Sequence, residues 1–332
     1  MIDSNSMQAL IVDTANAPFR LVELPRPTPA AGQVLVRIKA SGVNPLDGKI
    51  RAGTAGHARQ PLPAVLGMDL AGVVEQVGEG VTHLKVGDEV YGLATGIGGA
   101  QGSLAQFAAV EADLMAIKPR NLSMREAAGL PLVLITAWEG LVDRVGVKAG
   151  QTVLVQGGAG GVGHVAVQIA KALGANVFAT GSAASLDLIE SFGATAIDYR
   201  ANTVQEYVAE HTDGEGFDVV YDTVGGATLD ASFVAARIYG GHVVSCLGWG
   251  THSLAPLSFR AASYSGVFTL LPLLTGKGCA RHGEILREAA QLIEAGQLKP
   301  LMDERRFTLE TAQAAHELMA SGTATGRLVV EI

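Results

Sequence analysis

Glycines at fixed spacing stand almost halfway along this chain of 332 residues. The stretch 153–163 reads VLVQGGAGGVG, in which Gly158, Gly160 and Gly163 form the pattern G-x-G-x-x-G. A strand is expected before it, over 152–156, and a helix after it, over 164–174. In that setting the glycines permit a tight turn, a close approach to a pyrophosphate and close helix–strand packing, with the anion at the helix amino terminus. The pattern therefore predicts dinucleotide binding.

The end of the following strand indicates which dinucleotide is bound. A site specific for NAD carries Asp or Glu there, about 20 residues after the glycines, to hold the ribose 2′-hydroxyl. Here the sequence reads NVFATGSAAS, without a carboxylate before Asp187. Gly181 and Ser182 leave space for a 2′-phosphate, which favours NADP(H), although no Lys or Arg stands at 181–186. Tyr199 and Arg200, at the end of the third strand, are either adenosine contacts or ordinary surface residues.

Two regions of the chain differ in their predicted secondary structure, and these regions must position the residues named above. Its length exceeds the usual range of a single hydrophobic core, so two domains are expected. Residues 10–110 contain short β-like runs separated by Gly, Pro and Asp, which is typical of a β-barrel. Residues 152–268 alternate strands with helices, which predicts a parallel sheet with helices on both faces. The fold class is therefore α/β with an all-β companion domain.

Composition excludes several classes of partner. A net charge of −8 and a pI near 5.5 argue against a nucleic-acid-binding surface. The amino terminus has no signal-peptide pattern, and no apolar stretch is long enough to span a membrane, so a cytoplasmic protein without a membrane partner is expected. Cys246 and Cys279 are too few for a disulfide framework or a four-cysteine zinc site and are expected to be buried thiols.

Several motifs together resemble a known family. They are SGVNPLDGKIRAG at 41–53, LGMDLAGVVEQVG at 66–78, VGDEVYG at 86–92, LITAWEGL at 134–141, GGAGGVG at 157–163 and TGRLVVEI at 325–332. The chain resembles the zinc-independent quinone oxidoreductases, the zeta-crystallin-like branch of the medium-chain dehydrogenases/reductases. The resemblance implies a GroES-like β-barrel catalytic domain, 1–126 and 272–332, with a Rossmann doubly wound parallel-sheet domain, 127–271, inserted into it.

The zinc enzymes of that superfamily carry ligands that this chain lacks. They have a cysteine just after the strand where this chain has SGVNPLD, and Gly-His-Glu where it has Gly67, Met68 and Asp69. Three protein ligands are needed for a catalytic zinc, so no metal is expected. Reduction of an isolated carbonyl relies on a Lewis acid, whereas hydride addition to an enone or quinone spreads the charge over an oxyanion that hydrogen-bond donors can stabilise.

The resemblance also implies roles for individual residues. It places Asn44 near the nicotinamide and substrate, Asp47 in the pocket and Lys49 near the cofactor phosphate or ribose. Alternatively, Asn44 and Pro45 form a turn and Asp47 caps a short helix. The cofactor contacts that it implies are Asn44, Lys49, Thr136, Gly158, Gly160, Gly161, Val162, Gly163, Gly181, Ser182, Tyr199, Val224, Gly225, Cys246, Leu247, Gly248, Gly266, Val267 and Phe268.

Three functions remain open from the sequence. The leading one is an NADPH-dependent reductase of quinones or α,β-unsaturated carbonyls. The others are a trans-enoyl thioester reductase and a protein that binds NADPH without turnover. The family's subunits usually pair through the edge of the nucleotide-domain sheet, so a homodimer is expected, with 264–271 near the interface.

Overall fold

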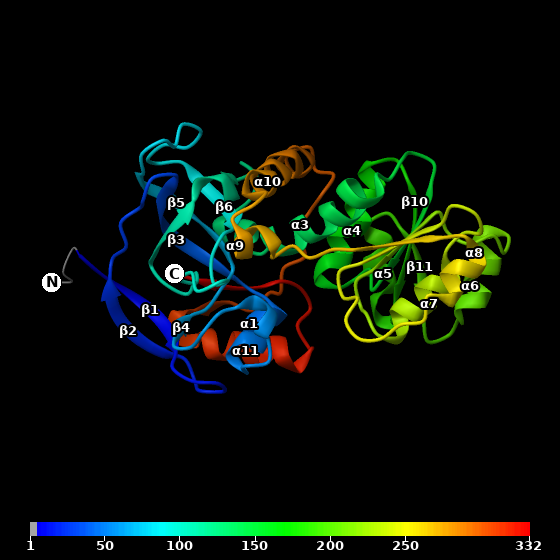
Figure 1. Cartoon of the computed structure of the whole chain (residues 1–332), viewed down its shortest axis with the longest axis horizontal. Coiled ribbons are helices and arrows are strands. Elements are labelled where there is room, and N and C mark those ends of the chain that lie inside the picture. Colours follow the sequence, from blue (N-terminus) through cyan, green and yellow to red (C-terminus); the bar gives the residue numbers. More distant parts are fainter. Residues whose placement is uncertain (1–4) are drawn as a thin grey trace. The chain divides into compact units, whose positions relative to one another are not determined.

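The computed structural model describes residues 5–332, which divide into two compact units (Figure 1). The first unit comprises the described residues up to Leu132 together with Leu270–Ala295 and Pro300–Ile332. The second comprises Val133–Thr269 and Gly296–Lys299. The sequence places the boundaries at 126/127 and 271/272. Residues 127–132 stay with the first unit because the carbonyl of Gly129 accepts a hydrogen bond from Arg327 and the N–H of Leu132 donates to Asp69.

Two sheets form the first unit, as expected for a GroES-like fold. The smaller has the order β2 (Arg20–Pro25), β1 (Ser6–Val12), β4 (Ala64–Val65). The larger has the order β15 (Phe307–Thr308), β16 (Leu328–Glu331), β3 (Gln33–Val43), β5 (Asp69–Val77), β6 (Glu89–Leu93), β8 (Met115–Ile117), and β7 (Phe107–Glu111) also pairs with β3. Antiparallel pairing of β16 with β3 adds a strand from the carboxyl-terminal segment to this sheet.

Apolar residues from alternate positions of β3, β5, β6 and β7 build the core of the first unit. Its helices are α1 (Pro45–Arg51), η1 (Gly56–Ala58), η2 (Ala112–Leu114), α2 (Met124–Ala128), α9 (Leu271–Thr275), α10 (Cys279–Glu294), η5 (Leu309–Thr311) and α11 (Ala312–Ser321). Ser123 and Glu126 start α2 with a reciprocal capping box. The helix α3 (Pro131–Trp138) leads from the first unit into the second.

Parallel strands form the sheet of the second unit. Their order is β11 (Thr195–Asp198), β10 (Asn176–Gly181), β9 (Thr152–Gln156), β12 (Val219–Asp222), β13 (His242–Ser245), β14 (Ser263–Gly266). Numbered along this domain, that is the 3-2-1-4-5-6 order of a Rossmann sheet, which confirms the predicted fold class. Val267 and Phe268, two of the cofactor contacts that the resemblance implies, follow the end of the last strand at Gly266.

Helices connect the strands of this sheet, which runs through the middle of the second unit in Figure 1. They are η3 (Glu139–Val145, a π-helix), α4 (Gly161–Ala172), η4 (Ala183–Ser185), α5 (Leu186–Ser191), α6 (Val204–Thr212), α7 (Ala227–Ala235) and α8 (Ala255–Arg260). Within residues 5–332 no helix is long and apolar enough to cross a membrane. Cys246 and Cys279 are both free thiols.

Candidate functional site

The glycine turn between β9 and α4 is shaped by contacts that tolerate no side chain. Gly157 has φ +77°, in the region that favours glycine. A Cβ atom on Gly163 would lie 2.0 Å from the carbonyl oxygen of Gly157, and one on Gly158 would lie 2.6 Å from the Cβ of Ala179. The turn is therefore packed directly against the start of α4 and the neighbouring strand, as predicted for helix–strand packing at these glycines. Their contact with a pyrophosphate stays a prediction.

Thr180 on β10 fixes the position of that turn. Its Oγ1 accepts the N–H of Gly157 at 3.0 Å and donates to Oε1 of Gln156 at 2.8 Å, while its carbonyl accepts the N–H of Gly158 at 2.8 Å. Gly160 is the N-cap of α4, so the amino terminus of this twelve-residue helix opens next to the turn. Such a terminus favours anions.

A cavity of about 280 Å³ lies over these elements. None of its lining residues is Asp, Glu, His, Lys or Arg; they are Gly157, Ala159, Gly160, Gly161, Val162, Thr180, Gly181, Ser182, Ser185, Tyr199, Thr223 and Val224. Seven of them belong to the predicted cofactor set. The other five are Gly157 and Ala159 of the glycine-rich stretch, and Thr180, Ser185 and Thr223. Thr180 and Thr223 stand at carboxyl ends of parallel strands, where ligands bind in such sheets.

Asp222, a fully buried residue at the end of β12, organises the next turns. Its carboxylate accepts the N–H groups of Val224 at 3.1 Å and Gly225 at 2.9 Å, and the hydroxyl of Ser245 at 2.6 Å. The Ser245 hydroxyl oxygen in turn accepts the N–H of Leu247 at 3.0 Å. One carboxylate thus sets three predicted backbone contacts. Asp222 was not predicted as a site residue; its signal in the sequence is an acid at the end of a strand, three residues before Gly225.

The remaining predicted contacts of the second unit lie outside the lining of this cavity. Thr136 is buried and shares a hydrogen bond of 3.0 Å with Thr269. Burial raises the pKa of the Cys246 thiol to about 12, so this group is neutral and unreactive at physiological pH. A Cβ atom on Gly248 would lie 2.2 Å from the hydroxyl oxygen of Tyr264. Cofactor contact by these residues, and by Gly266, Val267 and Phe268, stays a prediction.

In the first unit, a buried cluster of charged and amide groups surrounds Asn44. The Asn44 amide donates to Oδ2 of Asp69 at 2.9 Å, and its Oδ1 accepts from the guanidinium of Arg327 at 2.6 Å. Arg327 also donates to the carbonyl of Gly129 at 2.7 Å. Because both ends of the amide have a charged partner, its orientation is fixed. Asp69 and Arg327 were not predicted as site residues.

Asp47 belongs to the same cluster through the backbone. One carboxylate oxygen accepts the N–H of Asn44 at 2.8 Å and the other that of Gly67 at 3.2 Å, so Asp47 caps α1, the alternative role considered above. Asp47 is 1% exposed and Asn44 0%, and substrate contact by either stays a prediction. Burial raises the pKa of Asp47 to about 7 and that of Asp69 to about 6. Lys49 is exposed on α1, and its cofactor contact is likewise untested.

These residues do not fit a metal ion. A zinc site needs at least three His, Cys or carboxylate ligands, and no such group occurs within residues 5–332. Asp69 is already bonded to Asn44 and to the N–H of Leu132, and the guanidinium of Arg327 lies 3.7 Å from its Oδ2. A cation beside this carboxylate would be repelled by the charge of Arg327.

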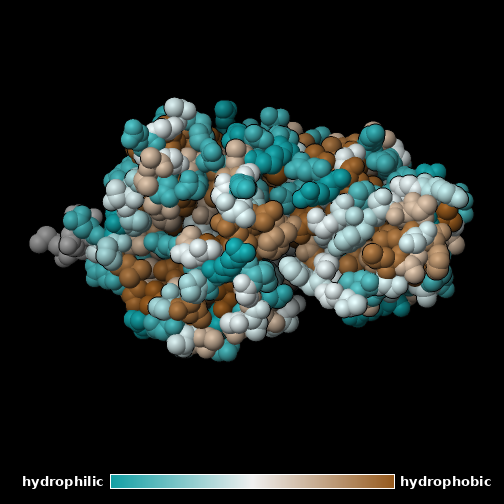
Figure 2. Space-filling model, in the orientation of Figure 1, coloured by the Kyte–Doolittle hydropathy of each residue, from teal (hydrophilic) through white to brown (hydrophobic). Residues whose placement is uncertain are grey.

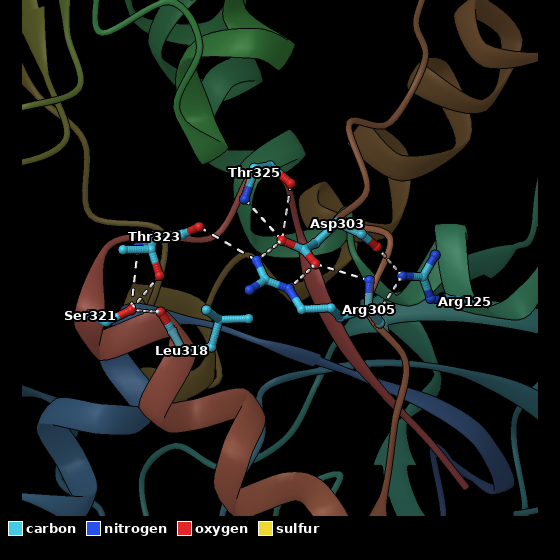
Figure 3. Close-up of polar contacts among 7 residues, drawn as sticks. All are labelled: Arg125, Asp303, Arg305, Leu318, Ser321, Thr323 and Thr325. Atoms are coloured by element: carbon cyan, nitrogen blue, oxygen red, sulfur yellow. Dashed lines mark hydrogen bonds and ion pairs between the residues drawn. The ribbon is translucent and has the colours of Figure 1, made fainter. Parts of the chain in front are cut away.

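A second network holds the backbone that carries Arg327 (Figure 3). The buried Asp303 carboxylate accepts two hydrogen bonds from the guanidinium of Arg305, at 2.8 and 2.6 Å, and the N–H of Thr325 at 2.9 Å. These bonds hold the pKa of Asp303 well below its usual range. Arg125 donates to the carbonyls of Asp303 and Arg305. Because Arg327 pairs with the adjoining segment through Leu301, this network fixes where Arg327 enters the cluster.

Comparisons with known proteins agree with both units. Residues 30–121 match the family model described as alcohol dehydrogenase GroES-like domain, and 192–330 match the one described as zinc-binding dehydrogenase. An NADPH-dependent alkenal/one oxidoreductase of Arabidopsis thaliana is 36% identical over 306 residues, which cover 90% of this chain and 72% of the relative. The chain belongs to the medium-chain dehydrogenase/reductase family.

Solved structures of medium-chain dehydrogenases/reductases share the whole fold. An alcohol dehydrogenase superfamily protein from Novosphingobium aromaticivorans is 57% identical, with a TM-score of 0.96 over 98% of this chain and 99% of that chain. A quinone oxidoreductase from Coxiella burnetii is 28% identical, with a TM-score of 0.82 over 98% of this chain and 99% of that chain. These matches confirm the predicted family, and with it the GroES-like domain and the Rossmann-type domain expected for an oxidoreductase of this family.

Replacement of Gly163 by alanine tests the glycine turn. The new Cβ atom would lie 2.0 Å from the Gly157 oxygen, so the turn must move, and overpacking of this kind costs about 1–3 kcal/mol. We expect NADPH affinity, measured by isothermal titration calorimetry, to fall about ten- to a hundredfold.

Gly48→Ala is the matched control, because a Cβ atom there meets nothing within 4 Å. It should leave NADPH binding unchanged. Unaltered binding by a folded Gly163→Ala protein would contradict the role of this turn.

Proposed function

We propose that this protein uses NADPH to reduce the activated double bonds of α,β-unsaturated carbonyl compounds and quinones. The observation that carries the proposal is the cluster at Asn44, where a buried guanidinium lies beside the carboxylate of Asp69 in place of any metal-ligand set. The activity named for the Arabidopsis thaliana relative supports the same chemistry. Zinc-independence is part of this proposal.

The chemistry follows from where negative charge develops. Bound NADPH supplies a hydride, which forms a C–H bond at the β-carbon of an enone while the electron pair of the double bond moves toward the carbonyl oxygen. The resulting enolate takes a proton from water at its α-carbon. With a quinone, the hydride's electron pair reduces the ring to a hydroquinone monoanion, whose phenolate oxygen takes the proton from water. Because the charge is delocalised, well-aimed hydrogen-bond donors can stabilise it without a Lewis acid.

Two groups of residues have distinct parts in this proposal. The glycine turn, Ser182, Tyr199 and the Asp222-ordered amides hold the cofactor. Asn44 has two amide hydrogens, of which the contact with Asp69 uses one; we assign the other to the developing oxyanion. The first unit supplies the substrate side and the second unit the cofactor side.

The test has two parts. Steady-state oxidation of NADPH is measured with a panel of 2-alkenals, quinones and an enoyl thioester, and reduction of NADP is measured with saturated alcohols. We expect turnover of alkenals or quinones and none of alcohols. Asn44→Ala should lower kcat about ten- to a thousandfold, the range for loss of one oxyanion donor. It should also lower the free energy of unfolding by about 1–3 kcal/mol, because Asp69 and Arg327 lose a buried partner.

Asn121→Ala serves as the control, since Asn121 makes one hydrogen bond of 2.8 Å, to the carbonyl of Ile293, and should retain kcat. Preference for the enoyl thioester over every enal and quinone would favour the thioester reductase instead. NADPH binding without turnover of any substrate would indicate a binding protein. Oxidation of simple alcohols without enone or quinone reduction would contradict the proposed chemistry.

We also propose a homodimer that pairs through β14. This strand ends the six-stranded sheet, and an unpaired edge strand is an aggregation hazard that dimerisation removes. Brown residues on the second unit in Figure 2 show apolar groups at its surface, and Tyr239 and Phe259 are 84% and 86% exposed. Light scattering at micromolar concentration should give twice the chain mass of 34.2 kDa. Tyr264→Pro should lower the measured mass to that of the monomer. A monomeric unmodified protein would contradict the proposed dimer.

A further inference from the structure

A histidine outside the clusters described above ties a loop of the second unit to a helix. His252 lies in the loop 246–254, which joins β13 to α8. Its Nδ1 lies 2.8 Å from Oδ1 of Asp230 on α7, and its Nε2 lies 3.2 Å from the carbonyl oxygen of Trp249. Only 12% of the His252 side chain is exposed. The imidazole thus connects this loop to α7, which lies next to α8 (Figure 1).

The two partners of the ring require a proton on both of its nitrogens. A carboxylate and a carbonyl accept hydrogen bonds and donate none, whereas a neutral imidazole has a single N–H group. In neutral His252, one ring nitrogen would therefore direct its lone pair at an oxygen atom. The imidazolium donates to both oxygens, so both contacts are satisfied only in the charged form.

The groups that face His252 favour this charged form. The carboxylate of Asp230 raises the pKa of His252 above its ordinary value of about 6.5; the carbonyl contact and the charge of Asp222 at the end of β12 act in the same direction, and partial burial opposes them. Phe233 of α7 meets the rings of His252 and of Tyr264 on β14 edge to face. Burial raises the pKa of Tyr264, so that group is uncharged at neutral pH.

The start of the same loop is held by the Asp222 network. The carboxylate of Asp222 holds the N–H of Leu247 through one serine hydroxyl, and the carbonyl of Leu247 accepts the N–H of Trp249 at 2.8 Å. Gly250, with φ +105°, lets the chain turn back so that His252 reaches the carbonyl of Trp249. The loop is therefore tied on both sides of Trp249, and the tie at His252 is lost when the ring loses its proton.

This loop lies beside the predicted cofactor contacts. Leu247 and Gly248 are among those contacts, and they follow the carboxyl end of β13, the edge at which ligands bind in such sheets. Trp249 is 54% exposed, and its ring meets that of Phe268 at a centroid distance of 6.1 Å. A loop that is already held in its binding conformation loses less conformational entropy when the ligand binds. A tie at His252 can therefore raise the affinity for a ligand that it does not touch.

We propose that His252 is a positioning residue whose imidazolium, paired with Asp230, keeps the loop 246–252 in the conformation that binds NADPH. The inference rests on the proposed function, since it requires the cofactor to use this loop. It goes beyond that function by making NADPH affinity depend on the charge of one histidine. Because the pKa of His252 is raised, the tie is complete at lower pH and is lost as the pH rises through that pKa.

The charge of His252 is measured directly by NMR titration of the imidazole C–H groups, with His252→Gln to identify its signals. We expect a pKa above about 6.5 in the unmodified protein. Asp230→Asn removes the charged partner and should lower this pKa. A pKa at or below 6.5, or one that Asp230→Asn leaves unchanged, would overturn the proposal whatever the ligand.

The effect on binding is measured as the dissociation constant of NADPH, by calorimetry at pH 6.5 and pH 9. In the unmodified protein this constant should rise about two- to fivefold between the two values, the range for loss of a partly exposed ion pair. His252→Gln has no charge to lose and should show the weaker affinity already at pH 6.5. Any pH effect that remains in His252→Gln belongs to titration of the cofactor phosphate.

His211→Gln is the matched control, because His211 is a histidine of the same unit that lies on α6 against Phe178. It should keep the affinity and the pH dependence of the unmodified protein. Equal pH dependence in His252→Gln and the unmodified protein would overturn the role of His252 while leaving the proposed function intact. Failure of the unmodified protein to bind NADPH at either pH would overturn the proposed function and this inference with it.

Discussion

The buried ion pair of Arg327 with Asp69 is the constraint on which the first unit's site depends. Both groups are almost completely buried, and removal of one partner from such a pair usually costs about 3–5 kcal/mol. Asn44 lies between them, with its oxygen toward the guanidinium and its nitrogen toward the carboxylate. The pair therefore determines the direction of the amide, while Asp47 fixes the backbone from which Asn44 projects.

The same pair ties distant parts of the chain together. Arg327 joins β16 to the end of α2 through the carbonyl of Gly129, and its own backbone is held by the Asp303 network. In the second unit, Asp222 has a comparable part, since it orders the turns after two strands. In each unit, then, a buried carboxylate positions groups that the sequence indicates to be functional. The carboxylate itself was not predicted to have a function.

The difference between residues in local motifs and the distant residues that hold them explains what the sequence could predict. Local spacing was sufficient for the glycine turn, and alternation of strands and helices was sufficient for the parallel sheet. The partners of Asn44 were beyond reach because Arg327 lies 283 positions away, a separation that no local pattern reveals. Thr180 and Thr223 were missed because single hydroxyl residues at strand ends are common.

The central claim is that hydride is delivered to an activated double bond and not to a carbonyl carbon. The most direct measurement uses NADPH deuterated at the transferable nicotinamide carbon, a 2-alkenal, and mass and NMR analysis of the product. The account predicts a saturated aldehyde with deuterium at its β-carbon and hydrogen from water at its α-carbon. An allylic alcohol with deuterium on the former carbonyl carbon would contradict it.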